Sequence, residues 1–75
     1  MRLSVLGSNG TYPTPGRPAS GYLVASGETT LLLDIGPGVF PAALAAGRLP
    51  DAIVISHVHS DHCLDLLALF NYLRF

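Results

Sequence analysis

Every histidine of the 75-residue chain lies in one short segment, residues 57–62 (HVHSDH). Residues two apart in an extended segment point to the same side, so His57 and His59 can present their imidazoles to one ion. Asp61 and His62 follow where the chain turns, and they face a different direction, which suits a second ion beside the first. The spacing therefore predicts half of a site for two metal ions.

The chemistry of these side chains favours transition metals. Imidazole nitrogen together with carboxylate oxygen suits Zn²⁺, with Mn²⁺ or Fe as alternatives, and it does not favour Ca²⁺. A catalytic zinc takes about three protein ligands and keeps one position for water, so two ions need about six ligand contacts. The segment offers four, and the other candidate ligands are too few and too poorly placed: Glu28, Asp34, Cys63 and Asp65. We therefore expect the site to be incomplete in this chain.

A simpler interpretation treats the same residues as polar groups at the start of a helix, with Asp61 as an ordinary N-cap. We favour the metal interpretation because ligand spacing directly after a strand is the more specific pattern, and Asp61 can cap and ligate together. Cys63, the single cysteine, can be read as a thiol ligand, but a small buried hydrophobic residue is the better interpretation.

The elements that must position this segment are an apolar strand before it and an apolar helix after it. Residues 52–55 (AIVI) are continuously apolar, which predicts a strand covered on both faces. From His62 to the end the pattern predicts a helix with almost no polar face, and such a helix is normally buried all round. Nothing else in the chain could surround both elements. We therefore expect residues 1–75 to be the N-terminal portion of a single, incomplete domain.

The earlier part of the chain predicts a small sheet, one loop and one helix. Alternation over residues 2–6 predicts a strand with one buried face, and the proline- and glycine-rich residues 8–19 predict a loop. A short glycine-containing connection between residues 21–25 and 29–33 predicts a β-hairpin. Residues 39–46 are alanine-rich and predict a helix.

Composition and charge exclude several classes of protein. The formal net charge is −1, and the four cationic side chains are scattered, so no basic patch recruits nucleic acid: Arg2, Arg17, Arg48 and Arg74. No apolar run approaches the roughly 20 residues that cross a bilayer, and no secretory signal pattern opens the chain. A single cysteine forms no intrachain disulfide, so we expect a reducing, cytoplasmic location.

Residues 57–62 resemble the His-x-His-x-Asp-His signature of the metallo-β-lactamase superfamily, and residues 31–36 (LLLDIG) resemble the strand and Asp-x-Gly turn that precede this family's first metal loop. The resemblance implies an α+β fold, the αββα sandwich, of which this chain covers the first strands, the first helix and the first metal loop with its following helix. It also implies that His57 and His59 bind one ion and that Asp61 and His62 bind the other.

The same resemblance implies that Asp34 braces the metal loop by contacting a ligand. The alternative for Asp34 is a turn-forming residue at the end of a strand.

Two further segments, residues 6–10 (LGSNG) and 17–24 (RPASGYLV), resemble the branch that contains ribonuclease Z and cyclic-nucleotide phosphodiesterases. Residues 56–67 are most similar to actinobacterial-style cyclic-nucleotide phosphodiesterases, in which Asp65 replaces the glycine common after the motif. The later histidine, the bridging aspartate and the final histidine that complete the family's two metal sites are absent from the chain.

The resemblance implies that a full-length domain hydrolyses a cyclic nucleotide or RNA-type phosphodiester through a hydroxide shared by two divalent ions, whereas the 75-residue chain alone is inactive. One alternative is a carboxylic ester, lactone or lactam hydrolase of the same fold. Another is a truncated, non-catalytic remnant. The expected partner is a small phosphodiester or nucleotide substrate, and no membrane partner is expected. A homodimer of the full-length protein is an alternative that the sequence leaves open.

Overall fold

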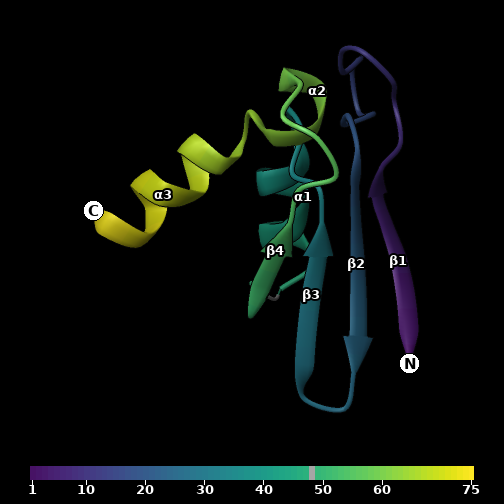
Figure 1. Ribbon diagram of the computed structural model, residues 1–75, viewed down its shortest axis with the longest axis vertical. Coiled ribbons are helices and arrows are strands. Elements are labelled where there is room, and N and C mark those ends of the chain that lie inside the picture. The colour runs from purple at the N-terminus through teal and green to yellow at the C-terminus, as the bar shows by residue number, and fades with distance from the viewer. Residues whose placement is uncertain (48) are drawn as a thin grey trace.

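The fold is built on a mixed sheet of four strands in the order β1-β2-β3-β4 (Figure 1). A computed structural model describes residues 1–47 and 49–75, so Arg48 lies outside the described residues. The strands are β1 (Arg2–Gly7), β2 (Gly21–Ser26), β3 (Thr29–Leu33) and β4 (Ala52–Val54). The first three strands pair antiparallel, and β4 pairs parallel to β3. Helix α1 (Val39–Ala45) forms the crossover that such a parallel pair requires.

The predicted hairpin is confirmed at β2 and β3. Ser26 lies opposite Thr29, so the connection is a two-residue turn. Gly27 has a φ of 61°, a left-handed conformation that favours glycine. The strand and helix predicted for residues 29–33 and 39–46 also appear where they were expected, apart from one residue at the end of α1.

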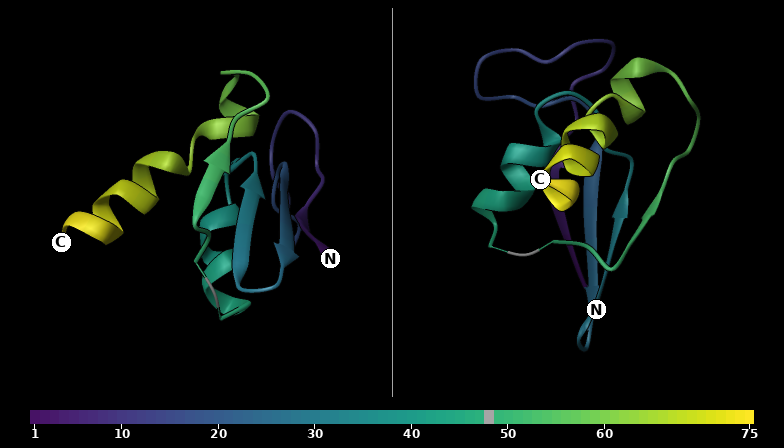
Figure 2. Two further views of the ribbon diagram at one scale, coloured as in Figure 1. Left: turned by 60° about the horizontal axis from the view of Figure 1, so that its bottom comes forward. Right: turned by 90° about the vertical axis from the view of Figure 1, so that its left-hand side faces the viewer.

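One face of the sheet carries the hydrophobic core. Leu32 pairs with Leu23 on one side and with Ile53 on the other, so these three side chains point to the same face. Helix α1 covers this face (Figure 2) and contributes the fully buried Val39. Leu69 joins the same cluster from the C-terminal helix. The core therefore ties the sheet to both of the longer helices.

The opposite face of the sheet is apolar and uncovered. Leu3 pairs with Val24, and Val24 pairs with Leu31, which places all three on the side away from α1. Leu3 and Val5 are 62% and 59% exposed, and Val54 is 48% exposed. The face of residues 2–6 that carries Leu3 and Val5 is therefore not buried by the described residues, and residues 52–55 are covered on one face only, because the helices pack on one side. The second cover of residues 52–55 was expected from polypeptide outside this chain. A sandwich places a second sheet against such an apolar face.

The single helix predicted from His62 onwards is divided in two. Helix α2 spans Ser60–Cys63 and α3 spans Leu66–Arg74. The division falls where Asp65 donates its backbone N–H to the carbonyl of Ile35 (3.0 Å) and accepts a hydrogen bond from the backbone N–H of Phe40 on Oδ2 (2.9 Å). These long-range bonds fix Asp65 against α1, and α3 then leaves in a new direction (Figure 1).

Helix α3 is covered on one side only. Leu69 is its only buried residue, so the expectation of a helix buried all round is not met among the described residues. None of the helices in residues 1–47 and 49–75 has both the length and the apolar character needed to span a bilayer.

Candidate metal centre

The candidate ligands lie at the edge of the sheet where β3 and β4 end. Because these two strands are parallel, their carboxyl ends meet, and this edge is where open α/β sheets bind ligands. Asp34 follows β3 directly, and residues 57–62 connect β4 to the first turn of α2 (Figure 1). The backbone N–H of Asp34 donates to the carbonyl of Val54 at 2.8 Å, which extends the strand pairing up to the site.

The three imidazole rings gather around His57. Its ring centroid lies 3.9 Å from that of His62 and 4.9 Å from that of His59. His57 and His59 are exposed, whereas His62 is half-buried. The spacing predicted that His57 and His59 point to one side and that His62 faces a different direction, yet the ring of His57 lies nearer to that of His62 than to that of His59.

Asp61 lies beside His62 and is held by the long loop. Its Oδ2 lies 3.2 Å from Nε2 of His62 and accepts a hydrogen bond from the backbone N–H of Thr11, also at 3.2 Å. Burial raises the pKa of the Asp61 carboxyl, but the Thr11 bond and the charge of His62 bring the pKa below its usual value. The carboxyl is therefore ionised at neutral pH. The N-cap of α2 is His59, so the interpretation of Asp61 as an ordinary N-cap is wrong.

Asp34 connects three segments of the site. Its Oδ1 accepts the backbone N–H of Ser56 at 2.7 Å, and its Oδ2 accepts the Ser56 hydroxyl at 2.7 Å. The same Oδ2 lies 2.8 Å from Nδ1 of His62. Burial raises the pKa of the Asp34 carboxyl, yet these hydrogen bonds bring the pKa below its usual value. Asp34 also occupies a turn with φ 64°, so it both forms the turn and contacts a candidate ligand.

The turn after Asp34 supports the metal loop through backbone contacts. The N–H of Ile35 donates to the carbonyl of His62 at 2.8 Å. At Gly36 the backbone of Asp61 approaches so closely that a Cβ would overlap it. The backbone of the Asp-x-Gly segment therefore packs against the first turn of α2 and supports it.

The donor atoms fit a divalent transition metal. A carboxylate can only accept, so Nδ1 of His62 carries the hydrogen that it shares with Asp34. When His62 is neutral, its Nε2 atom has a lone pair that faces Asp61 Oδ2, and a cation held by both atoms would relieve their repulsion. Among residues 1–47 and 49–75, however, no three His, Cys, Asp or Glu side chains are placed so that they could hold an ion by themselves.

The remaining candidate ligands do not join the cluster. Cys63 is half-buried and its Sγ donates weakly to the carbonyl of His59 at 3.4 Å. Asp65 is bonded to Phe40, and Glu28 lies in the hairpin turn at the far end of the sheet (Figure 1). Two residues of the site were missed: Ser56 stands next to the motif, whereas Thr11 contacts it only through the folded loop.

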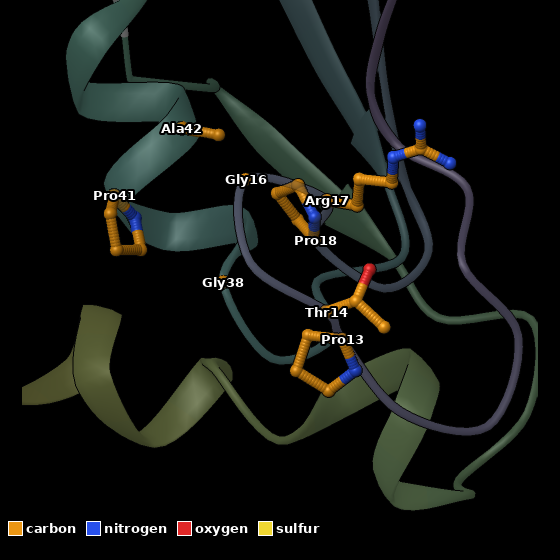
Figure 3. A pocket seen from close by; sticks show the side chains of 8 residues that line it. All are labelled: Pro13, Thr14, Gly16, Arg17, Pro18, Gly38, Pro41 and Ala42. Atoms are coloured by element: carbon orange, nitrogen blue, oxygen red, sulfur yellow. The ribbon is translucent and has the colours of Figure 1, made fainter.

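A surface pocket of about 380 Å³ lies next to the site's supporting loop, between that loop and α1 (Figure 3). Its lining is dominated by proline and glycine: Pro13, Thr14, Gly16, Arg17, Pro18, Gly38, Pro41 and Ala42. None of the candidate metal ligands lines it. The side chain of Arg17 points away from Pro41 in the close view.

A loop with histidines and an aspartate at the carboxyl edge of a sheet combines the side chains that bind transition metals with the place where open α/β sheets bind ligands. The family model of the metallo-β-lactamase superfamily matches residues 14–75. The chain belongs to this superfamily, as its sequence predicts.

Individual proteins are also similar to this chain, both in sequence and in structure. Protein ML1173 of Mycobacterium leprae is 42% identical over 78 residues, which cover 100% of this chain and 27% of the relative. The crystal structure of the metallo-β-lactamase fold protein YhfI from Bacillus subtilis matches with a TM-score of 0.81 and 35% identity over 89% of this chain and 28% of that one. The short form of human tRNase Z matches with a TM-score of 0.83 and 33% identity over 92% of this chain and 28% of that one.

These matches confirm the predicted α+β fold and the predicted position of the chain on the ribonuclease Z side of the superfamily. The chain spans little more than a quarter of the length of the relatives that it matches, 27% and 28%.

Proposed function

We propose that this chain supplies the first metal-binding loop of a metal-dependent phosphodiesterase that acts on a cyclic nucleotide or an RNA-type phosphodiester. The observation that carries the proposal is the geometry of His62, whose Nδ1 is engaged by Asp34 at 2.8 Å while its Nε2 faces Asp61 at 3.2 Å. Metal-binding histidines are characteristically oriented in this way by a carboxylate behind the ring.

The residues of the chain divide into ligands and supports. His57 and His59 would hold one ion, and Asp61 and His62 would hold the other. Two divalent ions held there, zinc with manganese or iron as alternatives, would lower the pKa of a bound water and neutralise charge on the phosphoryl oxygens. Asp34 fixes the ring of His62, and the backbone N–H of Thr11 fixes the carboxylate of Asp61. None of these side chains needs to carry a proton during the reaction.

The phosphodiester class is supported by the likeness to the short form of human tRNase Z, at 33% identity. The other metal ligands must come from polypeptide beyond the described residues, so we propose that the 75-residue chain is the N-terminal part of one domain and has no turnover alone. The single cysteine supports a reducing, cytoplasmic location.

The test uses the full-length protein that contains this chain. Metal content is measured by inductively coupled plasma mass spectrometry, and turnover is measured with bis(p-nitrophenyl) phosphate and, separately, with p-nitrophenyl acetate. We expect about two transition-metal ions per chain and a larger rate enhancement over the uncatalysed reaction for the diester than for the acetate. His59→Ala should lower both metal content and diesterase turnover.

Val58→Ala is the matched control, because Val58 stands between two candidate ligands and is 85% exposed. It should leave metal content and turnover unchanged. An unchanged metal count in His59→Ala would refute the ligand assignment. A larger rate enhancement over the uncatalysed reaction for the acetate than for the diester would instead favour an ester hydrolase of the same fold.

A further inference from the structure

Ser56, the residue directly before the histidine motif, is bonded to the site more firmly than its exposure suggests. Its backbone N–H and its hydroxyl both donate to Asp34, each at 2.7 Å. Its Oγ also lies 3.2 Å from Nδ1 of His57. Two short bonds to a buried carboxylate fix the position of this hydroxyl, so its contact with His57 has a defined geometry.

The direction of each hydrogen bond follows from counting hydrogens. A carboxylate has no hydrogen to give, so the single hydroxyl hydrogen of Ser56 must point to Oδ2 of Asp34. The Ser56 oxygen then has only lone pairs left for His57. A hydrogen bond between these two groups therefore requires that Nδ1 of His57 carries a hydrogen. The other nitrogen, Nε2, is left with its lone pair free.

His62 also carries its hydrogen on Nδ1, because this atom donates directly to Oδ2 of Asp34 at 2.8 Å. The distance from Ser56 Oγ to Nδ1 of His62 is 3.5 Å, so the hydroxyl interacts only weakly with that ring. One carboxylate oxygen thus acts on two histidines, once directly and once through the serine.

We propose that Ser56 is a positioning residue that sets the tautomer of His57, so that Asp34 orients His62 directly and His57 through the Ser56 hydroxyl. The proposal rests on the proposed function, because it concerns one ligand of each of the two ions. The orientations of His57 and His62 would then both depend on the buried side chain of Asp34.

The serine is needed because a neutral imidazole can carry its hydrogen on either nitrogen. With the hydrogen on Nε2, His57 would present an N–H to a cation instead of a lone pair. His57 is exposed, so burial does not select one tautomer of its ring. Loss of a partner that orients a ligand typically lowers metal affinity about 10–100-fold.

The test reads the tautomers by long-range ¹H–¹⁵N correlation NMR on the metal-free full-length protein, at about pH 8.5, where an ordinary imidazole is neutral. In the unmodified protein we expect the hydrogen of His57 on Nδ1. In Ser56→Ala it should distribute over both nitrogens, whereas His62 should keep its hydrogen on Nδ1, which shows that the site is still folded. Zinc affinity, measured by competition with a chelator, should fall about 10-fold or more.

Two further variants complete the test. Ser56→Thr retains the hydroxyl and should restore both the tautomer and the zinc affinity. Ser60→Ala removes a hydroxyl from the same segment that bonds none of the described side chains, so it should change neither. Retention of the Nδ1–H tautomer of His57 in Ser56→Ala would overturn the proposal, as would a failure of Ser56→Thr to restore it.

The outcomes also separate this proposal from the proposed function. An unmodified protein that binds no zinc overturns the phosphodiesterase assignment, and the NMR comparison still decides the role of Ser56. If the unmodified protein and Ser56→Ala bind zinc equally well, the phosphodiesterase assignment stands and the proposed role of Ser56 is overturned.

Discussion

The Nδ1 atom of His62 lies 2.8 Å from Oδ2 of Asp34, although 28 residues separate the two in the chain. This contact joins the end of β3 to the first turn of α2, and the Ser56 bonds join the end of β4 to the same carboxylate. Asp34 is therefore a structural residue and a support of the metal loop at once. Its removal should have two separable effects.

Asp34→Asn should lower the free energy of unfolding by about 2 kcal/mol, because hydrogen bonds to a charged group contribute roughly 1.5–3 kcal/mol. Urea denaturation of the full-length protein measures this change. Zinc affinity should fall as well, since an amide donor then faces Nδ1 of His62. Asp51→Asn is the control: Asp51 accepts the backbone N–H of Thr30 at 2.7 Å, far from the histidines. It should alter stability and leave zinc affinity unchanged.

A second prediction concerns Gly36, where the backbone of Asp61 leaves no room for a Cβ. Gly36→Ala should push the first turn of α2 away from the sheet and cost about 1–3 kcal/mol, the usual range for overpacking. Thermal melting and zinc titration of the same samples measure both consequences. At Gly10 an added Cβ would meet nothing within 4 Å, so Gly10→Ala should change neither quantity. Equal behaviour of the two variants would show that the Gly36 contact is unimportant.

Local patterns in the sequence were sufficient for the elements of the fold. Alternation, a glycine turn and a proline- and glycine-rich loop predicted β1, the hairpin and the segment that follows β1 close to where they lie. The spacing of the histidines predicted that His57 and His59 lie side by side, and their ring centroids are 4.9 Å apart, but it did not predict that the ring of His62 lies only 3.9 Å from that of His57. These features depend on residues that are close together in the sequence.

The features that could not be predicted depend on distant parts of the chain. The break between α2 and α3 arises because Asp65 bonds to Ile35 and Phe40, and nothing near Asp65 indicates either partner. The bond from Thr11 to Asp61 likewise exists only when the long loop folds over the site. The apolar faces of the first and fourth strands that α1 does not cover stay open in the described residues, because periodicity indicates which face is apolar and not what covers it.

The Asp65 contact leads to a third prediction. The N-terminus of α1 has no side-chain cap of its own, and Oδ2 of Asp65 accepts the N–H of Phe40 in its first turn. Asp65→Ala should therefore cost about 1 kcal/mol, as loss of a helix cap does, and should leave zinc affinity unchanged. Denaturant unfolding and zinc titration test the two parts. Asp65→Asn keeps an acceptor and should be nearly as stable as the unmodified protein. Lower zinc affinity in Asp65→Ala would instead indicate that Asp65 acts on the metal loop.

The last prediction concerns the apolar sheet face that carries Val5. In the described residues Val5 is 59% exposed, and a charged residue at an open edge strand would cost little. In a complete αββα sandwich the same face packs against a second sheet, where an unpaired carboxylate is strongly unfavourable. We therefore expect Val5→Asp to lower the free energy of unfolding of the full-length protein by about 3 kcal/mol or more, as measured by denaturant titration.

Ser26→Asp provides the comparison, because Ser26 is exposed at the hairpin end and should tolerate the charge. The 75-residue chain expressed alone has nothing to cover Val5, so it should bind a hydrophobic dye and aggregate or stay loosely packed. Addition of the later segments of the domain should abolish dye binding. If Val5→Asp proves as harmless as Ser26→Asp in the full-length protein, the face carrying Val5 remains open to solvent and no second sheet covers it. A sharp cooperative melt of the monomeric 75-residue chain would lead to the same conclusion.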